Sequence, residues 1–287
     1  MSVYDIFFVF GKPGSYVLDC PKRCVRHNIP SSLNAHLSEF PVTQILSLAL
    51  DCNDNYFVCT KYQYGGSKSR WFISGGAQRA YPTLQKFINE SKAAGRDITN
   101  FRVTFGSQGN DFVACNSATG AWRSWNASPG LNAQMQKAFA TKHVRVLAMG
   151  MNGAFAILYT DATFWFACSN NYPTLARLLQ NTRRGDLVFV AMNPYRGDEY
   201  FVVFANGQVH IKASAVLERD VETILGDYPN LEVITSTVVK RNTEVSNTSG
   251  LPPQARRKEF LKAIGASVGN GIVGAGISAI FGACTVM

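Results

Sequence analysis

Three tryptophans recur at comparable places along the chain and are the residues best suited to hold a ligand. Trp71, Trp122 and Trp165 each belong to a β-prone run that follows a turn, and Arg26 and His210 occupy the corresponding runs near the two ends. Indole rings stack on sugars and apolar molecules, so the five residues are candidates for a ligand pocket that Arg26 and His210 make asymmetric. Packing between repeated units requires the same recurrence, and the sequence leaves both interpretations open.

Residues that could carry catalysis form no recognisable motif. None of the four histidines lies in a nucleophile elbow, a zinc-binding helix or a phosphate loop. Cys20 and Cys24 lie four residues apart, but no second Cys or His pair completes a zinc site. The acidic pairs at 51/54 and 198/199 flank turns, where capping of backbone amides is the simplest role. We therefore expect no metal and no cofactor, and a function that is more binding than catalytic.

The last four residues, Cys284-Thr285-Val286-Met287, match the C-a-a-X pattern of a prenylation site. Thr285 replaces the first aliphatic residue, and a terminal methionine favours a farnesyl group. Cys284 is therefore the expected lipidation site, and a protein prenyltransferase is an expected partner. This chemistry requires a C-terminus that can enter the transferase.

The elements that would position these residues repeat five times. Each unit has a β-prone run, a turn rich in Gly, Asn or Asp, a second run opened by an aromatic residue, and a third run. After the third run, a Leu-rich segment with apolar residues four positions apart predicts a short helix. The aromatic residues are Tyr16, Tyr56, Phe112, Phe155 and Tyr200. The units cover about 1–41, 42–97, 98–142, 143–184 and 185–230.

Units that cannot bury their own apolar faces must stack on one another. Five units without atypical end repeats predict an all-β fold, a five-bladed β-propeller over residues 1–239 with short helical turns between blades. The run at 231–239 is expected to close the ring by completing the first blade. A two-sheet sandwich and a solenoid built from the same strands are the alternatives.

The repeats resemble five-bladed β-propeller proteins of fungi, including lectin-like ones, over about residues 3–239. The resemblance lies in the Gly-aromatic-apolar runs and the tryptophans of the third runs. It implies a propeller fold and, through relatives used in natural-product ring formation, a cofactor-independent cyclase or isomerase of a terpenoid-like substrate as one possible activity. It also implies a sugar-binding lectin as another, although Arg26 and His210 depart from a fully repeated pocket.

Composition limits the remaining classes. The chain has 287 residues, of which 46% are hydrophobic and 16% charged, enough to bury a sizeable core. Its first residues lack the basic and apolar regions of a signal peptide, so we expect a protein that is not secreted, with free thiols on its seven cysteines. The net charge of +9 raises the possibility of nucleic acid binding, but no such motif is present, and we expect none.

Much of the basic charge lies in the C-terminal tail. Residues 240–262 read as a polar, basic linker that contains Arg256, Arg257, Lys258 and Lys262, and residues 263–287 form a Gly-rich apolar tail. Basic residues beside an apolar segment favour anionic lipid. We therefore expect the chain to be held at the cytoplasmic face of a membrane, by a spanning tail or by an interfacial helix beside the prenyl group. A tail folded back onto the propeller is the third possibility.

These observations predict a prenylated, membrane-anchored binding platform for a protein or small ligand. Cyclase and lectin are the alternative functions. The number of pockets discriminates among them: one deep apolar cavity favours the cyclase, several similar shallow sites favour the lectin, and no pocket favours a protein-binding surface.

Overall fold

The computed structural model describes residues 3–39, 42–63, 67–139, 143–236 and 284–286. The chain divides into a first unit of residues 1–235 and 282–287 and a second unit of residues 236–281. Except for Ser236, the second unit lies outside the described residues, as do the predicted basic linker and most of the apolar tail. All elements below belong to the first unit.

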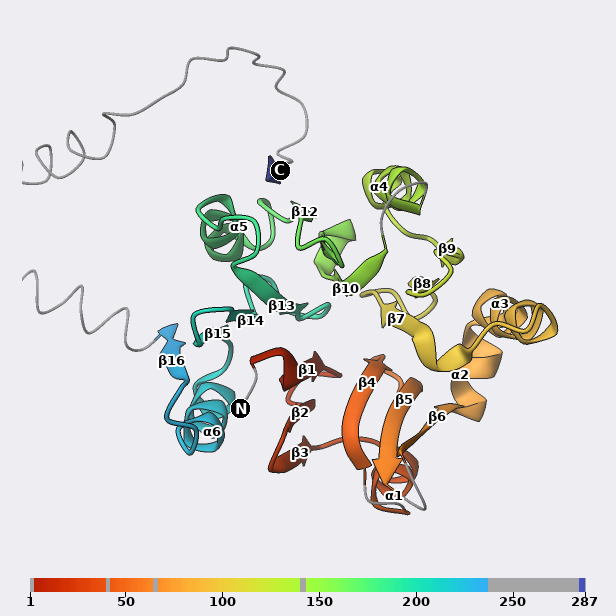
Figure 1. Cartoon of the computed structure of the whole chain (residues 1–287), viewed down its shortest axis with the longest axis horizontal. Helices are drawn as coiled ribbons and strands as arrows, with labels where there is room; N and C mark the ends of the chain where they lie inside the picture. Colours follow the sequence, from red (N-terminus) through yellow and green to blue (C-terminus); the bar gives the residue numbers. More distant parts are fainter. Residues whose placement is uncertain (1–2, 40–41, 64–66, 140–142, 237–283, 287) are drawn as a thin grey trace, which may run out of the picture. The chain divides into compact units, whose positions relative to one another are not determined.

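Five small antiparallel sheets make up the first unit, one for each predicted repeat, which confirms a mainly β chain (Figure 1). In each sheet three consecutive strands pair in chain order. The sheets are β1 (Phe7–Phe10), β2 (Tyr16–Cys20) and β3 (Arg23–His27); β4 (Val42–Leu50), β5 (Tyr56–Gln63) and β6 (Ser67–Ile73); β7 (Phe101–Phe105), β8 (Phe112–Asn116) and β9 (Trp122–Trp125); β10 (Val144–Met149), β11 (Phe155–Tyr159) and β12 (Phe164–Ala167); and β13 (Leu187–Met192), β14 (Tyr200–Phe204) and β15 (Gln208–Lys212).

Two of the sheets have a fourth strand. Strand β16 (Glu232–Thr235) pairs in parallel with β15, so the prediction that this run completes the first sheet is wrong. Parallel pairing needs a crossover, and the helix between β15 and β16 supplies it within the fifth sheet. Strand β17 (Cys284–Val286) pairs antiparallel with β12 in the fourth sheet.

A helix follows the third strand of every sheet, as the Leu-rich segments predict. These helices are α1 (Ser31–Glu39), α3 (Pro82–Ala93), α4 (Pro129–Phe139), α5 (Pro173–Gln180) and α6 (Ala215–Leu225). The second repeat also contains α2 (Gly75–Ala80), which the sequence analysis did not predict. Ser74 caps it by accepting a hydrogen bond from the Ala77 amide. Short 3-10 turns lie at Val3–Asp5, Ile98–Asn100 and Met151–Gly153.

The turn between the first and second strands is built alike in all five sheets. The residue after the first strand donates its amide to the carbonyl of the residue before the second strand. The donor–acceptor pairs are Gly11–Ser15, Asp51–Asn55, Gly106–Asp111, Gly150–Ala154 and Asn193–Glu199. Gly14, Asp54, Gly153 and Asp198 all have positive φ two residues before the aromatic anchor, which explains the Gly and Asp of the predicted turns.

Buried side chains form five separate hydrophobic clusters, each between two neighbouring sheets. One cluster joins the first and second sheets with α1, and the next three join second to third with α3, third to fourth with α4, and fourth to fifth with α5. The last joins the fifth sheet back to the first with α6. The order is therefore cyclic: β1 contacts β4, and the contacts continue through β7, β10 and β13 back to β1.

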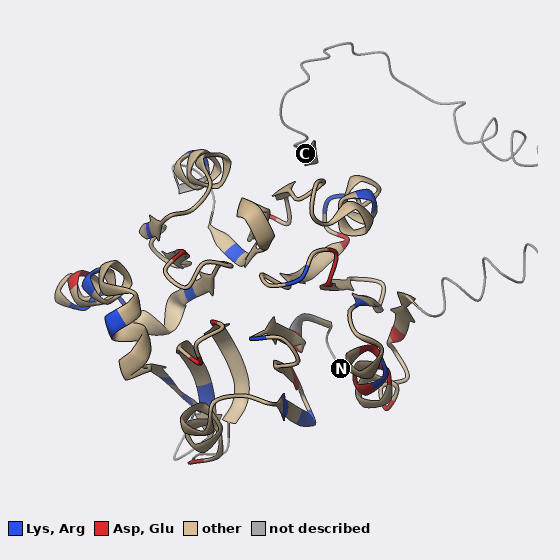
Figure 2. Cartoon of the chain, turned by 180° about the vertical axis from the view of Figure 1, so that it is seen from behind, with Lys and Arg blue, Asp and Glu red and all other residues tan. Residues whose placement is uncertain are grey.

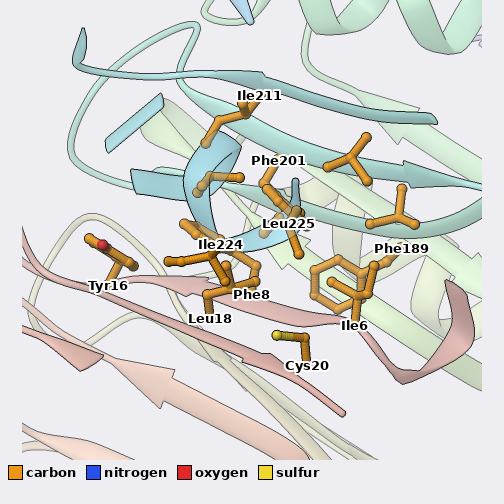
Figure 3. Packing of buried hydrophobic residues seen from close by; sticks show 14 of the residues in the cluster. Ile6, Phe8, Tyr16, Leu18, Cys20, Phe189, Phe201, Ile211, Ile224 and Leu225 are labelled. Carbon is orange, nitrogen blue, oxygen red and sulfur yellow. The ribbon is translucent and has the colours of Figure 1, made fainter. Parts of the chain in front are cut away.

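The cluster between the fifth and first sheets joins residues from opposite ends of the unit (Figure 3). Phe8 of β1 stacks on Phe201 of β14, with ring centroids 4.6 Å apart and planes 14° from parallel. Phe201 also meets Phe189 edge to face at 6.3 Å. Ile224 and Leu225 of α6 add aliphatic packing to the same cluster. These contacts close the cycle of sheets by burial of apolar surface.

Candidate ligand-binding site

The five pocket residues predicted from the sequence lie on the third strands, in different registers. Trp71 and Trp122 oppose residues three positions after their aromatic anchors. Trp165 and His210 oppose residues two positions after theirs, and Arg26 one position after. Because successive strand residues point to opposite faces, these side chains do not form one repeated ring.

Each tryptophan packs within the protein. Trp122 and Trp165 both pack against the cluster between the third and fourth sheets, and Trp165 stacks on Phe155 with centroids 5.8 Å apart. Trp71 packs against the cluster between the second and third sheets, with the Lys92 ammonium 5.4 Å from its ring centroid. Trp122 and Trp165 therefore pack against the same hydrophobic cluster, and Trp71 packs against a different one. These are packing contacts, and a ligand role for the three rings stays a prediction.

Arg26 and His210 also have local partners. Arg26 donates to the Leu37 carbonyl at 3.0 Å and to Ser38 Oγ at 2.7 Å, which satisfies acceptors at the C-terminal end of α1. His210 lies edge to face with Phe204 at 5.3 Å, and burial lowers the pKa of its imidazole. Both residues thus help to hold a helix or a strand within their own repeat.

Two of the four acidic residues at the turns, Asp51 and Asp198, accept hydrogen bonds from backbone amides, the role that the sequence predicts. Asp51 accepts hydrogen bonds from the amides of Asn53 and Asn55, both at 2.8 Å, and from Tyr81 Oη at 3.0 Å. Asp198 accepts from the amide of Thr174 at 3.0 Å, near the start of α5. Its other oxygen accepts from the Lys212 ammonium.

The predicted membrane and lipidation residues fall mostly outside the described part of the chain. Arg256, Arg257, Lys258 and Lys262 are not described. Cys284 is described only by its backbone, in β17. Among the described residues, no helix combines the length and the apolar character needed to cross a bilayer.

A cavity of about 240 Å³ lies among the first strands of all five sheets. Its wall is mainly apolar and includes partly exposed residues such as Phe7, Val9, Leu46, Val146 and Leu147. The five predicted pocket residues are on the third strands, and none of them is among the described residues that line this space. The cavity is therefore a different candidate site from the one inferred from the tryptophans.

Contacts between turns show that the first strands all end on the same side of the cavity. Lys12, in the first turn, forms an ion pair with Asp54, in the second, at 2.8 Å. Tyr172 Oη accepts a hydrogen bond from the amide of Met151 and donates one to the carbonyl of Asn193, which connects the fourth and fifth turns. We call this side the turn end.

The loop after β13 reaches across to other sheets at the turn end. Pro194 lines the cavity. Burial raises the pKa of the next residue, Tyr195, and Cys52, Asp51 and Asp111 of the second and third turns lie close enough to raise it further. The fifth turn therefore covers part of the turn end of the cavity.

The charged lining residues and Gln44 lie toward the opposite end, where the first strands begin. Arg102 and Arg145 are the second residues of β7 and β10, Gln44 is the third of β4, and Asp5 precedes β1. Figure 2 colours the Lys and Arg positions of the strands and helices blue. The cavity is thus amphipathic along its length, with an apolar wall and a basic end.

Arg102 is partly buried and donates from Nη1 to the carbonyl of Phe101 at 3.0 Å. Desolvation lowers the pKa of its guanidinium, which still stays charged near neutral pH. Arg145 donates to the carbonyl of Val188 on the neighbouring first strand. Sequence reasoning missed both residues, although a single arginine inside each of the apolar runs FRVTF (101–105) and VRVLAM (144–149) was a visible signal.

Sequence comparisons assign the chain to no group of known proteins. No protein-family model matches it, and no curated protein is significantly similar to it.

Proposed function

We propose that this chain is a non-catalytic binding protein whose central cavity holds a small, largely apolar ligand. The observation that carries the proposal is that the first strands of all five sheets contribute to one cavity. Ligand sites in proteins are typically concave and apolar, with a few placed polar groups, and this wall has that composition.

We further propose that the five sheets are the blades of a five-bladed β-propeller. Two features support this interpretation over a sandwich or a solenoid. The hydrophobic clusters follow a cyclic order, and one of them joins the fifth sheet to the first. A solenoid would leave its first and last repeats apart, and a sandwich would have one core between two sheets rather than five.

The cavity is large enough to hold a small organic molecule. Its volume is about 240 Å³, whereas a site for one water molecule needs about 10–15 Å³ of the same kind of space. The volume is therefore consistent with a compact ligand.

The composition of the wall favours binding over the cyclase or isomerase alternative. Acid–base catalysis needs a group of suitable pKa that reaches the substrate. Among the described residues that line the cavity, Asp5 is the one carboxyl group, and its side chain is exposed. The arginines stay protonated and are better suited to hold charge than to move protons.

Filling the cavity tests the proposal. Val146→Trp is expected to weaken the binding of fragment-sized ligands such as benzamide by at least tenfold, because the indole occupies the space that the ligand needs. Val216→Trp is the matched control, since Val216 is 61% exposed on α6. Isothermal titration calorimetry gives the affinities, and thermal unfolding confirms that both variants fold. Equal binding by Val146→Trp and wild type contradicts a site in the cavity.

We also propose that the C-terminal tail attaches the chain to a membrane, with Cys284 carrying a prenyl group. The support comes from the C-a-a-X pattern and the basic, then apolar, tail. The pairing of Cys284–Val286 with β12 competes with this modification, because the tetrapeptide must leave the sheet to enter a transferase. Attachment and strand pairing are therefore alternative uses of the same residues.

Expression in a eukaryotic cell tests the attachment. Wild type is expected to gain the mass of a farnesyl group, lose its last three residues and fractionate with membranes, whereas Cys284→Ser is expected to be unmodified and soluble. Cys52→Ser is the control, because Cys52 is an exposed cysteine outside the tail. An unmodified, soluble wild type contradicts prenylation, and a membrane-bound Cys284→Ser identifies the apolar tail itself as the anchor.

A further inference from the structure

One guanidinium in the cavity has no acidic partner among the residues that the structure describes. Arg102 lines the cavity and is partly buried, and within that part of the chain its side chain makes one hydrogen bond, to the carbonyl of Phe101. Among the described residues, no carboxylate lies within ion-pair distance of Arg102. The arginines that do form ion pairs in the described residues are more exposed, so water also solvates their charges.

A buried charge without a partner is costly, since it loses hydration and gains nothing in return. Because burial removes Arg102 from water, the pKa of its guanidinium is lowered. A planar guanidinium offers several N–H donors in a fixed fork that matches a carboxylate, and one of them is used by Phe101. A ligand with an acidic group would supply the missing acceptor.

The charges around the cavity suggest how acidic that ligand is. Two arginines, Arg102 and Arg145, line the wall together with one aspartate, Asp5. The formal charges of these three lining residues sum to +1, which matches a monoanion better than a phosphate dianion. The apolar residues on the remaining wall suit a hydrocarbon or aromatic body.

We propose that the ligand of the cavity is a small monocarboxylic acid, with its carboxylate bound by Arg102 and its apolar body against the first strands. The inference rests on the proposed function, because it specifies the chemistry of the ligand that the cavity binds. Arg145 adds positive potential at the same end, and Gln44 adds an amide to the wall there.

Titrations with matched acids and amides test this assignment on the full chain. Benzoate, phenylacetate and hexanoate are compared with their primary amides, which keep the shape and remove the charge. Wild type is expected to bind the acids at least tenfold more tightly than the amides, since a charge-assisted hydrogen bond is stronger than a neutral one. A preference for inorganic phosphate over all three acids contradicts a carboxylate ligand.

Substitution of Arg102 assigns the preference to one side chain. Arg102→Met is expected to bring the affinities for the acids and for the amides to within about twofold of each other. Arg102→Lys keeps the charge and is expected to retain part of the preference. Arg79→Met is the control, because Arg79 is an exposed arginine on α2.

The outcomes separate the two proposals. If amides and acids bind equally to wild type, the cavity is a binding site and the carboxylate assignment is wrong. If neither series binds, the proposed function itself is wrong. If the acid preference survives in Arg102→Met, the carboxylate is held elsewhere and the role of Arg102 is contradicted.

Discussion

Phe201→Ala is expected to lower the free energy of unfolding by about 3–5 kcal/mol, the range for removing a buried aromatic ring. Phe201 is fully buried and stacks on Phe8, so the cavity left by the substitution lies between the fifth and first sheets. Phe201 belongs to the apolar cluster that joins these two sheets. Urea denaturation followed by tryptophan fluorescence measures the loss.

Phe72→Ala is the control for this substitution. Phe72 is 40% exposed, so its removal is expected to cost less than about 1.5 kcal/mol. Similar losses for the two variants would show that the contact between the first and fifth sheets contributes no more than a surface contact. The cyclic order of the sheets would then lack its energetic basis.

Tyr172→Phe is expected to cost about 2–4 kcal/mol, although it removes a single oxygen atom. Tyr172 is fully buried, and its Oη accepts from the amide of Met151 at 2.9 Å and donates to the carbonyl of Asn193. Without the hydroxyl, two backbone groups lose a partner, and each unsatisfied buried group costs about 1–3 kcal/mol. A Cβ on Gly150 would lie 2.6 Å from the same oxygen, so the site is closely packed.

Tyr56→Phe provides the matched control, measured by the same denaturation. Tyr56 is also buried, but its hydroxyl has no hydrogen bond within the part of the chain that the structure describes. Its loss is expected to change the free energy of unfolding by less than about 1 kcal/mol. If Tyr172→Phe costs no more than Tyr56→Phe, the hydroxyl does not connect the fourth and fifth turns in solution.

The repeated architecture could be predicted from the sequence because its signals are local. Strands β7 (Phe101–Phe105) and β13 (Leu187–Met192) coincide with the β-prone runs FRVTF and LVFVAM of the sequence. Turns with Asp or Gly in the left-handed conformation separate these strands from their partners. Apolar residues four apart marked the helix that follows each sheet.

Strand register and strand partners could not be predicted in the same way. The tryptophans were treated as equivalent because each follows a turn, but Trp165 is offset by one position from Trp71 and Trp122 relative to the aromatic anchors. A one-residue shift turns a side chain to the other face, and turn length sets that shift. The partner of β16 depends on the path of α6, which is a tertiary property.

The candidate site depended on the same missing information. Arg102 and Arg145 are far apart in the sequence, but both line the cavity because β7 and β10 are neighbours in the structure. The three tryptophans lie on third strands, whereas the cavity is lined mainly by the first strands. An arginine inside an apolar run is a better indicator of a ligand site here. The apolar neighbours bury the arginine, and a buried charge is costly unless it has a partner.

The most direct test of the central claim is a crystal structure of the chain soaked with 4-bromobenzoate, in which bromine is located by its anomalous scattering. The account predicts a bromine peak among the first strands, with the carboxylate within hydrogen-bond distance of Arg102. Bromine only at surface positions would contradict a ligand site in the cavity. A molecule in the cavity with its carboxylate pointing away from Arg102 would contradict the carboxylate assignment alone.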